Sequence, residues 1–303
     1  FLDNIDTNSS TGPNHFANKL LKRLMSMGYS VYQPGEIPDL HLAFIESLYA
    51  PIKNPDGNTI PLIQRLDGIY FDPSSNYMMQ NYNILRTYRL ADAVIFQSNF
   101  SKELVTKYFG EHKNFTVIHN GADMDMVNEA VPYKIENREK YNKIWCCASH
   151  WRTFKRLDEN IRYFLEFSGD DDLLLIAGST EYVVKDSKIK YLGELSVKEL
   201  MSVYKASDTF IHLGRYDNCP NVVVDARACG CDIVCSSVGG TKEIAGIGAI
   251  VIEDHWDYEP EEVNIVRPLD FGKSYVNDCE TPVDMLQVAD KYSGFFSEVF
   301  CEN

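Results

Sequence analysis

Two aspartates in the second half of the chain are spaced so that both can reach one ligand. Asp217 precedes a predicted helix that starts near Pro220 or Asn221, and Asp225 lies one turn inside that helix. Carboxylates in these positions can accept hydrogen bonds from the hydroxyl groups of a sugar. The backbone N–H groups of residues 218–222 point outward at such a helix start, where they suit an anion or a hydroxyl. The alternative is that Asp217 simply caps the helix.

A cluster of cations precedes a second predicted helix. The segment HWRTFKR (residues 150–156) directly follows a predicted strand and carries Arg152, Lys155 and Arg156. Arginine can bind two phosphate oxygens at once and lysine acts as a point charge, so these side chains suit a diphosphate. A solvated loop is the alternative.

A glycine turn near the start of the chain offers a third place for an anion. Gly12 and Pro13 follow the first predicted strand and lead into a helix. Gly12 allows a ligand to approach the backbone, and the helix dipole favours negative charge. The turn lacks the full G-x-G-x-x-G pattern, so it does not indicate a dinucleotide. The alternative is a turn that connects the strand to the helix and binds no ligand.

Alternating strands and helices have to position these three segments. Short apolar runs alternate with helical patterns along the chain, which is typical of βαβ units and a parallel sheet. In the first half we expect strands at 1–5, 30–32, 40–45, 62–66, 93–98 and 115–121, and helices before Gly28, at 76–90 and at 101–109.

A polar, charge-rich stretch at residues 125–143 predicts a linker between two such series. The second series starts at Ile144, and Ser196 with Glu199 forms a capping box that marks one of its helix starts. We therefore expect an α/β protein with one domain over residues 1–141, a second over 142–282 and an amphipathic helix over 283–303.

Composition narrows the class of partner. The chain has 303 residues, of which 45% are hydrophobic and 24% charged, as in an ordinary globular protein. The net charge is −15 and no Lys/Arg cluster is dense enough for a phosphate backbone, which excludes nucleic acid as the main partner. No apolar run reaches 18 residues, so no membrane-spanning helix is expected. Most of the eight cysteines lie in apolar runs, which fits a reducing, cytoplasmic compartment.

Taken in order, these segments resemble the family-4 retaining glycosyltransferases of the glycosyl transferases group 1. Asp217 and Asp225 have the spacing of that family's E-x(7)-E motif, with aspartate at both positions. The segments ADAVIFQSNFSKEL, VIHNGAD, HWRTFKRL, LLLIAG, IKYLGEL and VGGTKEI agree in order and spacing. The resemblance covers nearly the whole chain and implies the GT-B fold. In that fold two Rossmann-like parallel-sheet domains face each other across a cleft, and the last helix crosses back to the first domain.

The resemblance also implies an activity and its residues. A sugar would pass from a nucleotide-diphosphate sugar to an acceptor hydroxyl with retention of configuration. Asp217 would contact the donor sugar, Asp225 the ribose, and Lys155 with Arg152 the diphosphate, although the family spaces that Arg–Lys pair more widely. The implied donor-binding residues are Gly12, Pro13, Arg152, Lys155, Gly193, Leu195, Asp217, Asn218, Cys219, Pro220, Asn221, Val222 and Asp225.

On the acceptor side, the segment IQRLDGIYF places Asp67 where many relatives carry a histidine beside the donor sugar. Asp67 would orient the acceptor hydroxyl of a carbohydrate or glycoconjugate, with Arg65 as its neighbour. An Asp-Gly turn that ends a strand is the alternative. The family generally needs no divalent ion, so we expect neither a metal nor another cofactor. The D-x-D at Asp123 and Asp125 is therefore interpreted as structural.

Two further expectations concern partners and rival functions. The helix after Gly12 carries Lys19, Lys22 and Arg23, and relatives that act on lipids dock through a basic helix, so peripheral membrane contact is an expectation. The aspartates in the motif, and a chain that opens at Phe1 without methionine, leave open a non-catalytic nucleotide-sugar-binding module of a longer protein. Another GT-B enzyme, such as a nucleotide-sugar epimerase, is the second rival.

Overall fold

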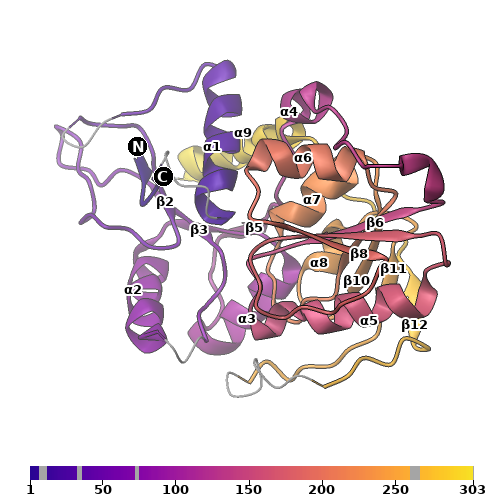
Figure 1. Ribbon diagram of the computed structural model, residues 1–303. Helices are drawn as coiled ribbons and strands as arrows, with labels where there is room; N and C mark the ends of the chain where they lie inside the picture. Colours follow the sequence, from indigo (N-terminus) through magenta and orange to yellow (C-terminus); the bar gives the residue numbers. More distant parts are fainter. Residues whose placement is uncertain (7–11, 33–35, 72–74, 260–266, 303) are drawn as a thin grey trace. The chain divides into compact units, whose positions relative to one another are not determined.

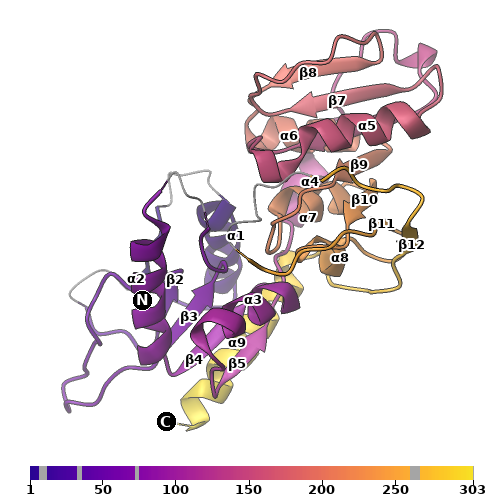
Figure 2. The ribbon, with the colours of Figure 1, turned by 90° about the horizontal axis from the view of Figure 1, so that it is seen from below.

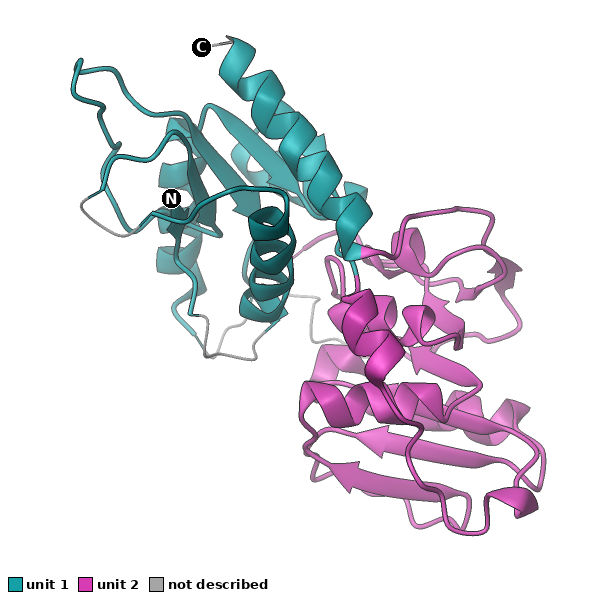
Figure 3. Cartoon of the chain, turned by 90° about the horizontal axis from the view of Figure 1, so that it is seen from above, with its two compact units in different colours: residues 1–121, 285–303 teal, residues 122–284 magenta. Residues whose placement is uncertain are grey.

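The computed structural model describes residues 1–6, 12–32, 36–71, 75–259 and 267–302 (Figure 1). The chain divides into two compact units, which are unit 1 (residues 1–121 and 285–303) and unit 2 (residues 122–284) (Figure 3). Each unit is built on a sheet of mainly parallel strands with helices packed on it, which confirms the predicted α/β class.

Unit 1 contains a five-stranded parallel sheet whose strands lie in the order of the sequence. Two helices that are far apart in the sequence, α1 (Gly12–Ser26) and α9 (Met285–Glu302), pack against each other in one hydrophobic core. Phe16 of α1 and Tyr292 of α9 meet in that core, with ring centroids 6.1 Å apart. The strands are β1 (Leu2–Asp3), β2 (His41–Phe44), β3 (Leu62–Leu66), β4 (Ala93–Phe96) and β5 (Phe115–Val117), and the other helices are α2 (Tyr77–Leu90) and α3 (Asn99–Phe109).

Two predictions for the first half are wrong. Residues 30–32 form no strand, because the run is short and Val31 remains 37% exposed instead of facing a core. Residues 125–143 are not a plain linker, because they contribute to unit 2. Asp123 caps a short helix, α4 (Met124–Glu129), by accepting a hydrogen bond from Asp125 N, and Val127 is buried in the core of unit 2. The sequence did not predict this short amphipathic helix because the surrounding residues are rich in charge. Its packing places residues 122–141 with the second unit.

Unit 2 contains a seven-stranded sheet in the order β12-β11-β10-β9-β6-β7-β8. The chain lays down β6, β7 and β8 in one direction and then returns to place β9, β10 and β11 on the other side of β6. The strand order therefore reverses between β6 and β9, which are hydrogen-bonded neighbours. The strands are β6 (Ile144–Ala148), β7 (Leu173–Ala177), β8 (Ile189–Gly193), β9 (Thr209–His212), β10 (Asp232–Ser236), β11 (Ile250–Ile252) and the antiparallel edge strand β12 (Ser274–Val276).

Helices bury both faces of this sheet, which explains why its strands are continuous apolar runs. Along β6, Ile144 and Cys146 face one core, whereas Trp145 and Cys147 face the other. The first core also receives residues of α4, α6 (Val197–Lys205) and α7 (Asn221–Ala228), and the second receives α5 (Leu157–Phe167) (Figure 2). The predicted capping box of Ser196 and Glu199 is present at the start of α6. The remaining helix, α8 (Thr241–Ile244), follows β10.

Candidate functional site

The reversal of strand order in unit 2 brings two functional loops to one edge of the sheet. The loop after β6 (residues 149–156) carries the predicted cations, and the loop after β9 (residues 213–220) carries Asp217. Because β6 and β9 are parallel neighbours, both loops leave the sheet at its carboxyl edge. In open α/β sheets this switch point is where ligands bind.

Three side chains converge at this point. Lys155 donates a hydrogen bond from Nζ to Oδ2 of Asp217, and His212 donates from Nε2 to the same oxygen at 2.8 Å. Burial opposes ionisation of the Asp217 carboxyl group, but Lys155 and His212 outweigh that effect and hold its pKa well below the ordinary value. The site therefore presents an ionised carboxylate, with the side chain 16% exposed, beside an ammonium group.

Glycines of the neighbouring loop hold the backbone of Asp217. Gly240 donates a hydrogen bond from its N to the Asp217 carbonyl at 2.7 Å. Gly239 has a φ of +91°, and a Cβ there would lie 2.9 Å from that carbonyl oxygen. The segment VGGTKEI thus needs glycine at this position so that Asp217 can approach.

Sequence reasoning missed His212. Its ring is 3% exposed and stacks on Phe210 with centroids 6.3 Å apart. The available signal was a single polar residue at the carboxyl end of the apolar run TFIH, five positions before Asp217. Because the ionised Asp217 carboxylate accepts the hydrogen bond, Nε2 of His212 carries the proton.

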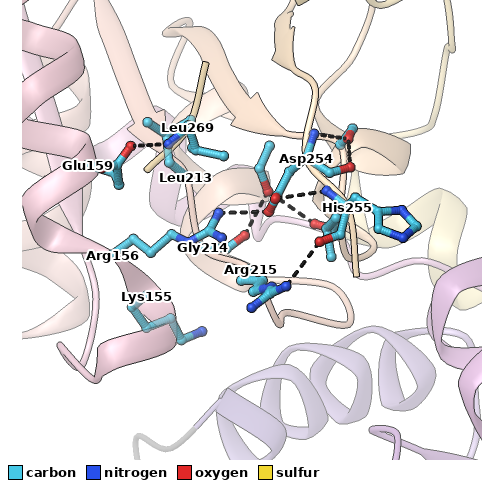
Figure 4. Close-up of polar contacts among 12 residues, drawn as sticks. Lys155, Arg156, Glu159, Leu213, Gly214, Arg215, Asp254, His255 and Leu269 are labelled. Carbon is cyan, nitrogen blue, oxygen red and sulfur yellow. Dashed lines mark hydrogen bonds and ion pairs between the residues drawn. The ribbon is translucent and has the colours of Figure 1, made fainter. Parts of the chain in front are cut away.

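The predicted cluster of three cations separates in the structure. Arg156 adopts a φ of +52° in the left-handed region and turns a 1% exposed guanidinium to Asp254, with Nη1 and Oδ2 2.8 Å apart (Figure 4). Arg152 is exposed and Lys155 contacts Asp217. The expectation that Arg156 serves a diphosphate is therefore corrected, since its charge is used inside the unit.

Asn160 ties the loop after β6 to the end of β9. Its Nδ2 donates to the carbonyl of Arg156 at 2.6 Å, and its Oδ1 accepts from Leu213 N at 3.2 Å. Arg215 N also donates to the carbonyl of Phe154 at 2.7 Å. These bonds hold the backbone around Lys155 in a fixed position relative to the loop that carries Asp217.

The other predicted donor-binding residues lie at two places in unit 2. At the start of α7, Cys219 and Pro220 are buried, whereas Asn218, Asn221 and Val222 are half-buried. Asp225 lies on the second turn of α7 and is 4% exposed. At the end of β8, Gly193 has a φ of +70° and its carbonyl accepts from Gly178 N at 2.7 Å, while Leu195 packs against the core.

In unit 1 the predicted residues occupy the starts and ends of elements. Gly12 and Pro13 open α1, and the rest of the predicted turn (residues 7–11) lies outside the described residues. Arg65 is 1% exposed and its guanidinium lies 4.2 Å from the centroid of the Phe16 ring. It donates to the Asp67 carboxylate and, at 2.8 Å, to Oδ1 of Asn120. Arg65 is therefore an interior residue, whereas Asp67 retains a 17% exposed side chain at the end of β3.

Three observations on the described residues concern metal binding and membranes. Among the described residues, no group of three or more His, Cys, Asp and Glu side chains is arranged to hold a metal ion. No helix in the described part of the chain combines the length and apolar character needed to cross a bilayer. In α1, Lys19 is 4% exposed and Lys22 is exposed, so the basic face expected there is smaller than the sequence indicates.

Two curated proteins match parts of the chain. Over 193 residues the chain is 23% identical to an uncharacterized glycosyltransferase of Methanocaldococcus jannaschii, a match that covers 58% of this chain and 48% of that protein. Over 119 residues it is 28% identical to the O-antigen chain mannosyltransferase B of Escherichia coli, covering 37% of this chain and 30% of that protein. The matched stretches thus span about half or less of the length of these curated relatives.

Comparisons with solved structures agree on the fold. A glycosyltransferase involved in avilamycin A biosynthesis aligns with a TM-score of 0.62 at 12% identity, over 100% of this chain and 98% of that one. HepE of Anabaena, solved in complex with UDP and glucose, aligns with a TM-score of 0.55 at 18% identity, over 78% of this chain and 72% of that one. The fold is therefore GT-B, as predicted. Residues 148–259 match the family model of the glycosyl transferases group 1, and this matched segment includes Lys155, His212, Asp217 and Asp225.

Proposed function

We propose that the chain transfers a sugar from a nucleotide-diphosphate sugar to an acceptor hydroxyl, with retention of configuration. The observation that carries this proposal is the contact of Lys155 and His212 with an ionised Asp217 at the switch point of unit 2. This contact lies inside the segment that matches the family. The structures of HepE with UDP and with UDP-glucose support a nucleotide sugar as the class of donor.

Lys155 stabilises the leaving group in this proposal. As the bond between the anomeric carbon and the phosphate oxygen breaks, the diphosphate gains negative charge. An ammonium group has three N–H donors, and the Asp217 contact uses one of them, which leaves two for phosphate oxygens. Arg152, exposed on the same loop, and the N–H groups at the start of α7 add to this stabilisation. No divalent ion is required.

In this proposal the two aspartates bind different parts of the nucleotide sugar. The sugar gains positive charge as the diphosphate leaves, so the ionised carboxylate of Asp217 stabilises it and accepts hydrogen bonds from its hydroxyl groups. Asp225, buried on α7, binds the ribose of the nucleotide. The acceptor hydroxyl attacks from the face that the diphosphate leaves, and the leaving phosphate takes its proton. We therefore assign no nucleophile to the chain.

In unit 1, Asp67 orients the acceptor hydroxyl in this proposal. Arg65 cannot contact an acceptor itself, because its guanidinium is buried against Phe16. It acts on Asp67, whose carboxylate it holds by an ion pair. A carbohydrate or glycoconjugate is the class of acceptor that suits this role.

A thermal unfolding screen tests the proposal. UDP, GDP, ADP and their sugar conjugates are added in turn, and a true ligand at one hundred times its dissociation constant stabilises the folded chain by about 2.7 kcal/mol. Release of the nucleoside diphosphate from the bound donor then measures turnover. The matched control is Lys155→Met, which keeps most of the length of the side chain and removes its charge. Failure of every nucleotide to stabilise the chain contradicts the proposal, and binding without turnover identifies a nucleotide-sugar-binding module instead.

A further inference from the structure

His212 contacts Asp217 but has no role of its own in the proposed mechanism. Its Nε2 bonds to Oδ2 of Asp217, the same oxygen that accepts from Lys155. We infer that His212 is a positioning residue, which fixes the direction of the Asp217 carboxylate toward the donor sugar. This inference rests on the proposed function, because the sugar contact of Asp217 belongs to it.

Lys155 and His212 differ in whether they can set the orientation of the Asp217 carboxylate. Lys155 carries a point charge at the end of four flexible methylene groups, so it supplies charge without a preferred direction. The imidazole of His212 is planar, and its N–H points along a single line. Direction at the carboxylate therefore comes from His212.

The ring of His212 is itself held in place. His212 is the last residue of β9, and its backbone pairs with Cys235 of β10. The ring stacks on Phe210, with an interplanar angle of 11°. Gly214 lies close to the ring, where an added Cβ would come within 3.2 Å of Nε2. A buried ring between a strand, an aromatic face and a glycine has little freedom to turn.

Lys155 and His212 also differ in the hydrogen bonds they make once a nucleotide sugar binds. Lys155 shares its N–H groups between Asp217 and the leaving diphosphate, so its hold on the carboxylate weakens as negative charge develops. His212, 3% exposed, has no such second duty in the proposed mechanism. Lys155 and His212 both donate their hydrogen bonds to Oδ2 of Asp217, and neither donates to Oδ1. Oδ1 is thus the oxygen offered to a sugar hydroxyl, and His212 keeps it aimed.

Two substitutions separate this role from simple packing. The amide nitrogen of Gln can occupy the position of Nε2 and donate to Asp217, whereas Met fills similar space and donates nothing. With UDP-glucose as the first probe, His212→Met should lower kcat by about tenfold to a hundredfold, the range expected for a hydrogen bond to a charged group. His212→Gln should keep kcat within about threefold of the wild type. The affinity for UDP, measured by calorimetry, should change little in either variant, because UDP lacks the sugar that Asp217 contacts.

A second histidine–aspartate pair provides the matched control. His255 and Asp257 are also 2.8 Å apart, but their side chains are 77% and 66% exposed. His255→Met should leave kcat, KM and thermal unfolding unchanged. The inference is overturned if His212→Met retains full kcat, if His212→Gln loses as much as His212→Met, or if His212→Met weakens UDP binding in step with kcat. A wild-type chain that neither binds nor turns over any nucleotide sugar would instead overturn the proposed function, and the inference with it.

Discussion

Arg156 allows backbone strain and side-chain charge to be measured separately. Its φ of +52° costs a non-glycine residue about 1–2 kcal/mol. Its guanidinium is 1% exposed and pairs with an Asp254 side chain that is 10% exposed. Removing one partner of a buried pair costs about 3–5 kcal/mol, because the other charge stays buried without compensation. Arg156→Ala should therefore lower the free energy of unfolding of unit 2 by about 3–5 kcal/mol, and Arg156→Gly, which relieves the backbone, by about 2–4 kcal/mol.

Urea unfolding followed by tryptophan fluorescence measures these values in unit 2 alone. All three tryptophans, Trp145, Trp151 and Trp256, lie within residues 122–284. The control is the double variant Arg156→Ala with Asp254→Ala, which should lose less than the sum of the single losses because the two groups are in contact. If Arg156→Ala is as stable as Arg156→Gly, the backbone at residue 156 is not strained and that part of the reasoning is refuted. If both variants are as stable as the wild type, the ion pair with Asp254 does not stabilise unit 2 and the rest of the reasoning is refuted.

Three further predictions concern the site. Asp225→Ala should weaken nucleoside diphosphate binding by about 1–3 kcal/mol in calorimetry, whereas Asp217→Ala should lower turnover and leave that affinity nearly unchanged; equal losses of affinity would mean that the two roles are assigned wrongly. Turnover should survive EDTA, and a loss restored by Mg²⁺ or Mn²⁺ would contradict the metal-free mechanism. The lowered pKa of Asp217 gives the folded chain stability above the ordinary carboxyl pKa, which is lost as the pH falls below it. Lys155→Met raises that pKa, so acid unfolding should begin at a higher pH, and an unchanged acid transition would show that the pair does not contribute.

Local sequence rules predicted much of what positions the site. The capping box at Ser196 fixes the start of α6, and the alternation of strands and helices identified a parallel sheet in each unit. The rule that parallel strands release their loops at one edge is also enough to place Lys155 and Asp217 near each other. These features depend on residues close in sequence or on general properties of parallel sheets.

Features that depend on distant contacts could not be predicted. Arg156 follows Lys155 directly, yet its charge is buried because Asp254, 98 residues away, meets it. The edge strand β12 is exposed at all three residues, so it carries no alternating pattern. In the sequence, His212 is only the last residue of an apolar run. Its contact with Asp217 depends on the path of the turn between them, which only the structure gives.

The placement of α9 affects how the chain folds during synthesis. Residues 1–121 leave the ribosome before unit 2, but their core lacks Val288, Tyr292, Phe296 and the other buried residues of α9 until all of unit 2 has been made. At about 5–20 residues per second, that delay is on the order of ten seconds or more. During this interval the apolar face of α1, with Phe16 and Leu20, has no covering helix, whereas unit 2 is continuous in sequence and can fold as soon as it emerges. Residues 1–121 are therefore made before unit 2 but reach their final packing only after it, when α9 has been made.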